Sequence, residues 1–477
     1  MPSLRKGLER ALRPRTIAVV GDKRANAYLW LRNMSTFRGK VYSVQVDPNE
    51  IPGIEELGVP NFASLAEIPD EIDYVMCAVP RPVASRIIAD CAAKGVGGVA
   101  LFTSGFAETG EEEGAQLQHE LGRIAREAGL ALIGPNCMGV YNPSLGVRQS
   151  AEQPAGEGGP VGFISQSGTH AINFAQVGAA QGVRISTSIS MGNAEVLDVP
   201  DYLDYLVADP DTEVIAMYVE GTKDGRRLFE SLKRAADEKP VVVWKGGVTE
   251  AGARATASHT AALATSQHVW DAVVRQAGAI ATDTMDDTID ALKALLYCKP
   301  GVGRRMGLMA MTGGQSVVIT DAFARAGLDV PLLTEKSYEE LASFFNIIGG
   351  SYRNPLDMGG TIGFGGQQGA LERLLKILDT DAHVDAIAME LASGFMARQW
   401  QADPSSLDRM LDLLTAHKER SDKPFLTILH PGHLEDVTFK ARQRVAERGL
   451  AAFHSFERAA IALSRAIGYW RRRQELE

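Results

Sequence analysis

One histidine lies in a segment of unusually small residues, Lys245-Gly-Gly-Val-Thr-Glu-Ala-Gly-Ala-Arg-Ala-Thr-Ala-Ser-His-Thr260. The segment follows an apolar run at 240–244, and its glycine and alanine content predicts a long loop rather than an ordinary helix start. Imidazole accepts a phosphoryl group near neutral pH. His259 is therefore a candidate phosphoryl acceptor, with a satisfied surface or core histidine as the alternative.

Two further segments place small polar residues between an apolar run and a helical pattern: Ser165-Gln-Ser-Gly168 and Thr312-Gly-Gly-Gln-Ser316. The free N–H groups and the positive dipole at a helix start form an anion site. Ordinary N-caps and tight turns are the alternatives. Two such turns in one chain favour a shared phosphate site, whose candidate residues are Ser165, Ser167, Gly168, Gly313 and Gly314.

An acid, Glu220, follows the apolar run at 214–219. A carboxylate there could hold the second nitrogen of an imidazole and fix its tautomer. A helix-capping or salt-bridged glutamate is the alternative.

The first part of the chain also carries polar or glycine residues after its apolar runs, but no GxGxxG fingerprint. Asp47 follows the second run, where a dinucleotide-binding domain holds its ribose-binding acid, and we expect it to be a turn residue. The segments in question are Gly21, 78–80, 103–108 and 134–139.

Short β-branched runs alternate with amphipathic stretches along the whole chain, which predicts parallel sheets with crossover helices. Ligands of such sheets bind at the carboxyl ends of the strands. We expect an α/β protein of three doubly wound domains at 1–145, 158–298 and 304–477, with linkers at 152–160 and 299–305. The expected strands are 16–20, 41–46, 74–79, 98–102 and 131–133, then 161–164, 183–189, 214–219 and 240–244, and last 306–311, 330–333, 386–391 and 425–429, before a helix at 455–472.

Composition excludes several classes of function. The formal charge of −10 over 477 residues argues against nonspecific nucleic-acid binding. The four cysteines form no CxxC pair, so we expect free thiols rather than disulfides or a metal site. The basic N-terminus lacks the apolar stretch of a signal, and no apolar run reaches the roughly 20 residues of a membrane span. We therefore expect a cytoplasmic protein.

Together, the segments resemble the α subunit of the nucleoside-diphosphate-forming acyl-CoA synthetases, particularly ADP-forming acetyl-CoA synthetase and, more distantly, succinyl-CoA synthetase. The resemblance covers nearly the whole chain. It implies a Rossmann-like CoA-binding domain, a flavodoxin-like phosphohistidine domain and a third flavodoxin-like (ligase-CoA) domain. Its motifs are Gly134-Pro-Asn-Cys-Met-Gly139, Ser165-Gln-Ser-Gly168, the glycine-rich segment ending in Ser258-His-Thr260, and Asn354-Pro-Leu-Asp357.

The resemblance assigns roles to these residues. It implies that His259 is phosphorylated, that Glu220 orients it, and that the helix starts at Ser165–Gly168 and Gly313–Gly314 face the phosphate. The acyl-site residues would be Pro135, Asn136, Gly192 and Asn193, and the CoA-binding residues Gly21, Lys23, Val79, Pro80, Ser104, Gly105 and Phe106. Asp22, beside them, would oppose a phosphate.

The implied reaction is reversible and passes a phosphoryl group from a nucleoside triphosphate to His259 and then to a carboxylic acid, whose acyl phosphate CoA attacks. The chain shows no ATP-grasp segment, so the resemblance implies a separate β subunit that binds ATP or ADP with Mg²⁺, in a homo- or hetero-oligomer without nucleic acid or membrane. Residues 260–265 read Thr-Ala-Ala-Leu-Ala-Thr, where the family commonly has Thr-Gly-Ser-Leu-Ala-Gly. A non-catalytic CoA-binding or regulatory protein, another CoA-dependent acyl transfer, and a dinucleotide-dependent oxidoreductase are the alternatives.

Overall fold

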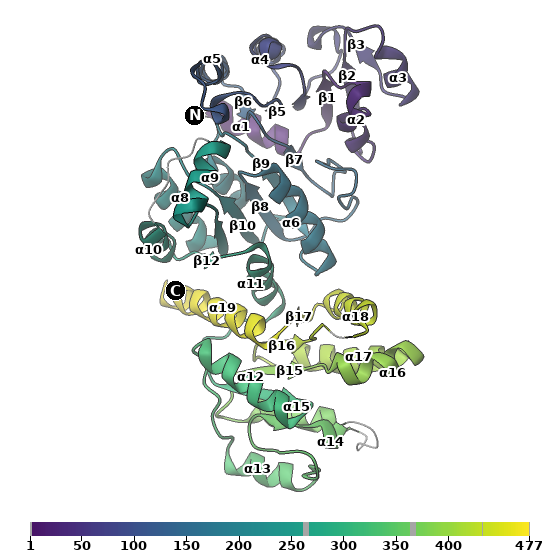
Figure 1. Ribbon diagram of the computed structural model, residues 1–477, viewed down its shortest axis with the longest axis vertical. Coiled ribbons are helices and arrows are strands. Elements are labelled where there is room, and N and C mark those ends of the chain that lie inside the picture. Colours follow the sequence, from purple (N-terminus) through teal and green to yellow (C-terminus); the bar gives the residue numbers. More distant parts are fainter. Residues whose placement is uncertain (1, 261–266, 363–368, 432, 477) are drawn as a thin grey trace. The chain divides into compact units, whose positions relative to one another are not determined.

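The computed structural model describes residues 2–260, 267–362, 369–431 and 433–476; the side chains of 2–3, 257–260 and 393–395 are outside this description. The chain forms two compact units (Figure 1). The first comprises residues 1–179 and 183–285, and the second 180–182 and 286–477. No helix among the described residues is long and apolar enough to cross a bilayer.

The first unit contains two sheets. The first is wholly parallel, in the order β3-β2-β1-β4-β5-β6, which is the order of a dinucleotide-binding fold. Its strands are β1 (Thr16–Val20), β2 (Lys40–Val44), β3 (Asn61–Phe62), β4 (Tyr74–Cys77), β5 (Gly98–Leu101) and β6 (Ala131–Ile133). Its helical segments are α1 (Pro2–Leu12), η1 (Arg24–Asn26), α2 (Leu29–Asn33), α3 (Ile51–Glu56), η2 (Leu65–Glu67), η3 (Arg81–Val83), α4 (Ala84–Lys94), η4 (Ala107–Thr109) and α5 (Glu112–Ala128).

The second sheet has the order β12-β11-β10-β8-β9-β7, parallel except where β7 pairs antiparallel with β9. Without β7 this is a flavodoxin-like arrangement. Its strands are β7 (Gly139–Tyr141), β8 (Val161–Ser165), β9 (Ile185–Ser190), β10 (Val214–Val219), β11 (Val241–Lys245) and β12 (Ile280–Thr282). Its helices are α6 (Gly168–Ala180), α7 (Val199–Ala208), α8 (Gly225–Glu238), α9 (Glu250–Thr260) and α10 (Gln267–Ala277).

The second unit holds one parallel sheet in the flavodoxin-like order β14-β13-β15-β16-β17. Its strands are β13 (Met306–Ala310), β14 (Leu356–Asp357), β15 (Ala386–Glu390), β16 (Phe425–Ile428) and β17 (Ala451–Phe453). Its helices are α11 (Met285–Tyr297), α12 (Gly313–Arg325), α13 (Glu335–Ala342), α14 (Gly359–Ile362), α15 (Ala370–Thr380), α16 (Ser393–Ala402), α17 (Pro404–Arg420), α18 (Glu435–Glu447) and α19 (Phe456–Leu476).

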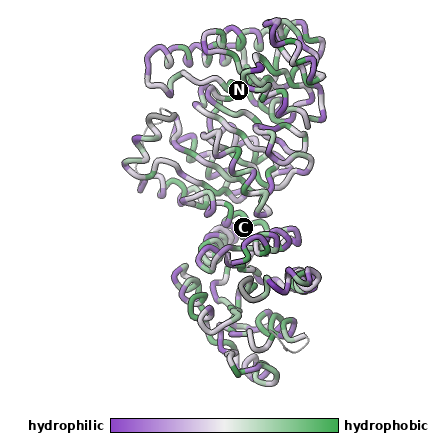
Figure 2. Tube along the Cα trace, turned by 45° about the vertical axis from the view of Figure 1, so that its right-hand side comes forward, coloured by the Kyte–Doolittle hydropathy of each residue, from purple (hydrophilic) through white to green (hydrophobic). Residues whose placement is uncertain are grey.

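Hydrophobic periodicity explains how these elements pack. The buried residues of α8 are Leu228, Ser231, Leu232, Ala235 and Ala236, a spacing that puts one stripe against the sheet. Hydrophobic and hydrophilic stretches accordingly alternate along the helices (Figure 2). In the first unit one continuous core includes residues of both sheets, such as Ile17, Ile133, Ile164 and Ile189.

The predicted α/β class with three doubly wound sheets is confirmed, and two local predictions are wrong. Residues 330–333 form no strand. The edge position beside β13 (Met306–Ala310) is occupied instead by the two-residue strand β14, which pairs with β13 in parallel. Residues 250–260 are helical rather than a loop. Alanine is the best helix former, and the Thr249 hydroxyl accepts a hydrogen bond from Gly252 N at 3.0 Å at the start of α9.

Candidate functional site

The predicted CoA-binding residues lie at the carboxyl ends of the neighbouring strands β1, β4 and β5. Gly21 has φ +82°, and a Cβ there would lie 2.7 Å from Val79 Cγ1. The Thr103 hydroxyl donates to Val79 O at 2.5 Å, and the Arg81 guanidinium donates to Gly105 O at 2.7 Å. The structure therefore brings together Gly21, the Val79–Pro80 segment and the loop from Ser104 to Phe106.

Asp22 does not face this edge as an exposed charge. It is 1% exposed and accepts hydrogen bonds from Leu31 N at 2.9 Å and Lys23 N at 3.1 Å. Burial raises the pKa of its carboxyl. Its role is to hold the chain between β1 and α2, whereas Lys23 itself is exposed. The Asp22 carboxylate is therefore occupied by backbone donors rather than directed to solvent.

The four predicted acyl-site residues come from two segments in close contact. Asn193 N donates to Pro135 O at 3.0 Å, and Asn136 Nδ2 donates to Asn193 Oδ1 at 3.3 Å. Gly192 has φ +52°, and a Cβ there would lie 2.3 Å from both Pro135 O and Asn136 O. Because any side chain at this position would collide with the facing backbone, glycine is required here.

The start of α6 lies beside these segments. A Cβ at Gly168 would lie 2.7 Å from Met138 Cγ, and Met191 N donates to Ser165 O at 2.8 Å. Asn136 N also donates to Thr103 O at 3.1 Å, which joins the same segment to the predicted CoA loop. A continuous set of contacts therefore connects the predicted CoA, acyl and phosphate residues of the first unit.

The serines at the start of α6 use their hydroxyls locally. Ser165 Oγ donates to Ser167 O at 2.7 Å, and Ser167 Oγ accepts from His170 N at 3.3 Å. Ser167 is thus an N-cap, which was the alternative to a phosphate ligand. Among the described residues, however, no acceptor takes the N–H groups of Gly168 or Thr169. Anion binding at this helix start therefore depends on the backbone rather than on the hydroxyls.

Glu220 lies directly after β10 and is 5% exposed. The Tyr218 hydroxyl donates to Glu220 Oε1 at 3.0 Å. Gln166 Oε1 accepts from Gly221 N at 3.0 Å and also from Glu220 N, so one amide ties the ends of β8 and β10 together. Sequence reasoning missed Gln166, although its place between two predicted phosphate-binding serines was an available signal.

An aromatic cluster supports Tyr218. Its ring centroid lies 4.5 Å from that of His170 and 4.5 Å from that of Trp244. Burial raises the pKa of the Tyr218 phenol, which therefore stays protonated and donates to Glu220. Lys245 Nζ donates to Glu220 O at 2.7 Å, and burial lowers the pKa of this ammonium group.

His259 belongs to α9, but its side chain lies outside the described residues. Gly247, which precedes α9, lies against the middle of this helix. A Cβ at Gly247 would lie 2.4 Å from Thr256 Oγ1, so only glycine lets the segment before α9 approach the helix this closely. Helix α9 also contacts η4 in the predicted CoA domain. The phosphorylation of His259 and its pairing with Glu220 remain predictions.

The other predicted helix start belongs to the second unit. A Cβ at Gly313 would lie 3.4 Å from Asp357 Oδ2, and Glu390 Oε2 accepts from Met311 N at 2.9 Å. Burial raises the pKa of both carboxyl groups. A phosphate at Gly313 and Gly314 would therefore meet two acidic side chains.

Asn354, in the Asn354–Asp357 motif, has a structural role. Asn354 Oδ1 accepts from Leu308 N at 2.9 Å, and its Nδ2 donates to Met306 O at 2.7 Å. These bonds hold the motif against β13. A cavity of about 400 Å³ lies beside it, lined by residues of α12 and the 351–357 segment, including Ser316, Val317, Arg353 and Asp357.

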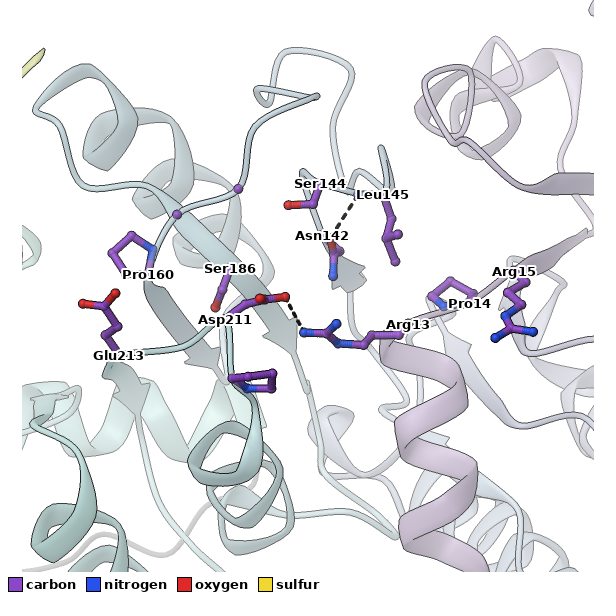
Figure 3. Close-up of a pocket in the computed structure, with 13 residues that line it drawn as sticks. Arg13, Pro14, Arg15, Asn142, Ser144, Leu145, Pro160, Ser186, Asp211 and Glu213 are labelled. Carbon is purple, nitrogen blue, oxygen red and sulfur yellow. Dashed lines mark hydrogen bonds and ion pairs between the residues drawn. The ribbon is translucent and has the colours of Figure 1, made fainter.

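A cavity of about 720 Å³ in the first unit lies at the amino ends of β8 and β10 (Figure 3). Arg13 reaches across it to Asp211 at 2.5 Å, and the Asn142 side chain turns to Leu145 N. None of the predicted site residues lines it. Since ligands of parallel sheets bind at the carboxyl ends of strands, this cavity is not the candidate active site.

Comparison with known proteins is consistent with this geometry. Family models describe residues 15–143 as a CoA binding domain and 158–295 as a succinyl-CoA ligase like flavodoxin domain. The chain is 33% identical to the α subunit of acetate–CoA ligase [ADP-forming] II of Pyrococcus furiosus, over 94% of this chain and 95% of that protein. It is 33% identical to acetate–CoA ligase [ADP-forming] I of Archaeoglobus fulgidus, over 80% of this chain but 54% of that protein.

A solved structure resembles the whole chain. It is that of dinucleotide-forming acetyl-coenzyme A synthetase 1 of Ca. Korarchaeum cryptofilum, in complex with phosphate and ADP. The TM-score is 0.83 at 29% identity, covering 98% of this chain and 97% of that one.

Proposed function

Because this chain belongs to the family of ADP-forming acetate–CoA ligase α subunits, we propose that it is the subunit of an acid–CoA ligase that carries the phosphohistidine and binds CoA and the acid. The observation that carries the proposal is the continuous set of contacts in the first unit. It joins the loop at Thr103, the Asn136–Asn193 pair and the start of α6.

The reaction takes place in three steps. His259 Nε2 or Nδ1 takes a phosphoryl group from a nucleoside triphosphate, which leaves as the diphosphate. The carboxylate of the acid then attacks this phosphorus and releases the imidazole, giving an acyl phosphate. The thiolate of CoA last attacks the acyl carbon, and inorganic phosphate leaves.

Residues of this chain have a defined part in each step. The N–H groups of Gly168 and Thr169 stabilise the charge of the transferring phosphoryl group. Glu220, held by Tyr218, orients the imidazole. Pro135, Asn136, Gly192 and Asn193 enclose the acid, and the loops at Gly21, Val79 and Ser104 bind CoA. Gly313 and Gly314 would act on the phosphate only with Asp357 and Glu390 protonated or otherwise neutralised.

The partner is a separate ATP-grasp subunit that brings the nucleotide with Mg²⁺. Two relatives that align over nearly their whole length are named α subunits, which supports a division of one enzyme over two chains. We place the complex in the cytoplasm and divide this chain into domains at 1–145, 158–298 and 304–477.

The test is acyl-CoA synthesis by the chain purified with its ATP-grasp partner. With acetate as the first acid, CoA, ATP and Mg²⁺, we expect acetyl-CoA and phosphate in equal amounts, measured by chromatography and a phosphate assay. His259→Ala should abolish synthesis, whereas His268→Ala, an exposed histidine on α10, should not. The isolated chain should hydrolyse no ATP. Synthesis by His259→Ala would remove the catalytic role and favour a CoA-binding regulatory protein.

A further inference from the structure

Glu108 connects the predicted CoA loop to the predicted acyl site. Its carboxylate accepts from Gly105 N at 2.5 Å and from Phe106 N at 3.1 Å. The same carboxylate accepts from Asn193 Nδ2 at 2.6 Å, across 85 positions of the chain. One side chain therefore holds backbone donors of the loop with both oxygens and the amide of the acyl-site residue with Oε2.

Two of the three residues that donate to Glu108 are buried. Phe106 is 1% exposed and Asn193 is 7% exposed. Buried donors that lose their acceptor cost more free energy than exposed ones, and bonds to a charged acceptor are stronger than neutral ones. The conformations of the loop and of Asn193 are therefore linked through this carboxylate.

The Gln118 side chain also stabilises the contact between Glu108 and Asn193. Gln118 Oε1 accepts from Asn193 Nδ2 at 2.9 Å, and Gln118 Nε2 donates to Glu195 Oε2 at 3.0 Å. Burial works against charge on Glu195, but Lys223, Gln118 and Arg126 hold the pKa of its carboxyl below the usual range. Asn193 thus has fixed partners on two sides, Glu108 and Gln118.

The position of Glu108 adds a third connection. It lies in η4, which contacts α9, the helix that carries His259. The segments predicted to bind CoA, the acid and the phosphoryl group all meet at η4.

We propose that Glu108 is a positioning residue that couples the two binding sites, so that the CoA loop and Asn193 keep their binding conformations only together. This inference rests on the proposed function for the identity of the ligands. The bridge itself is a property of the structure, whatever the ligands are.

The decisive variants are Glu108→Gln and Asn193→Ala, alone and together. In Glu108→Gln one carboxylate oxygen becomes an NH₂ group, so whichever way the amide turns, it faces donors from Asn193 or from the loop. Glu111→Gln is the matched control, because Glu111 is exposed and its side chain caps nothing at the start of α5.

CoA affinity is measured by calorimetry on the complex with the partner subunit, without acid. We expect each single variant to weaken CoA binding about tenfold, the effect of losing one hydrogen bond to a charged group. The double variant should be no weaker than the worse single one, since both remove the same bridge. In the assay, Glu108→Gln should raise KM for the carboxylic acid and for CoA more than it lowers kcat. Glu111→Gln should match wild type in KM and kcat.

Hydrogen exchange of the ligand-free chain gives a readout that needs no activity. Glu108→Gln and Asn193→Ala should both accelerate exchange in the peptide that contains Gly105 and Phe106. Wild-type CoA affinity in Glu108→Gln, or fully additive losses in the double variant, would overturn the coupling. Wild type that binds CoA and shows the coupling but makes no acyl-CoA would instead refute the proposed function alone.

Discussion

Glu220 is held more tightly than a general solvent-facing acid. Its carboxylate accepts from the Tyr218 hydroxyl at 3.0 Å, and its backbone N–H is fixed by Gln166. A carboxylate with one oxygen held by a phenol can present the other to an imidazole. This is the arrangement by which partner carboxylates orient histidines.

At the residue scale we predict that Glu220→Gln lowers the rate of His259 phosphorylation by about 10- to 100-fold, the usual effect of losing such a partner. Tyr218→Phe removes only the hydrogen bond to the carboxylate and should have a smaller effect. Rapid-quench measurement of phosphoenzyme formation in the complex distinguishes them. Equal rates for wild type and Glu220→Gln would exclude the orienting role.

Several residues that sequence reasoning identified, such as Gly21, Ser165 and Glu220, directly follow an apolar run. That pattern assigned no role to Glu108 or Gln118, whose importance comes from contacts with Asn193 across 85 and 75 positions of the chain. Side-chain bridges between distant segments leave no local pattern in one sequence.

At the element scale, α11 contains a buried ion pair whose two members also bind β17 and α19. Lys293 Nζ lies 2.6 Å from Asp290 Oδ1, with side chains 1% and 2% exposed. Lys293 also donates to Ala452 O at 2.8 Å, and Arg458 pairs with Asp290. Burial lowers the pKa of Lys293 despite its acidic partner.

We predict that Lys293→Met destabilises the protein by about 3 kcal/mol, because it leaves a buried carboxylate with Arg458 alone. Asp290→Asn/Lys293→Met should recover part of this loss. Urea unfolding measures both, with Lys376→Met, at an exposed position of α15, as the control. A loss below about 1 kcal/mol in Lys293→Met would show that the pair contributes little.

Long apolar runs determine most of the fold, and short elements depend on their neighbours. The predicted strands at 16–20, 131–133 and 214–219 match β1, β6 and β10. The strands β3 and β14 have two residues each, which is too short for an alternation of apolar and polar residues to be recognised in the sequence. The 330–333 run resembles a strand in composition, but the edge beside β13 is taken by β14.

At the scale of the whole molecule, buried histidines make stability depend on pH. In the second unit His454 Nδ1 is buried without a hydrogen-bond partner among the described residues. Burial, and then the charges of Lys293, Arg442 and Arg458, lowers the pKa of His454 from 6.5 to about 4. Between about pH 4 and 6.5, His454 is therefore protonated in the unfolded chain but neutral in the folded chain.

Because the unfolded state binds this proton more readily than the folded state, lowering the pH favours unfolding. The free energy of unfolding is unaffected by His454 above pH 6.5 and decreases as the pH falls from 6.5 toward about 4. His454→Gln should therefore lose less thermal stability than wild type between pH 7.5 and 5. Thermal midpoints at the two pH values, compared with His268→Gln, measure this difference. A wild-type-minus-variant difference that stays constant with pH would contradict it.

The central claim is that His259 carries a phosphoryl group. The complex with the ATP-grasp partner is incubated with [γ-³²P]ATP and Mg²⁺, and the label on this chain is tested for stability in acid and base. We predict an acid-labile, base-stable label that is absent in His259→Asn and retained in His268→Asn. The label should be lost when CoA and the carboxylic acid substrate are added together. A label that persists in His259→Asn, or no label on a wild-type complex that binds CoA, would contradict the account.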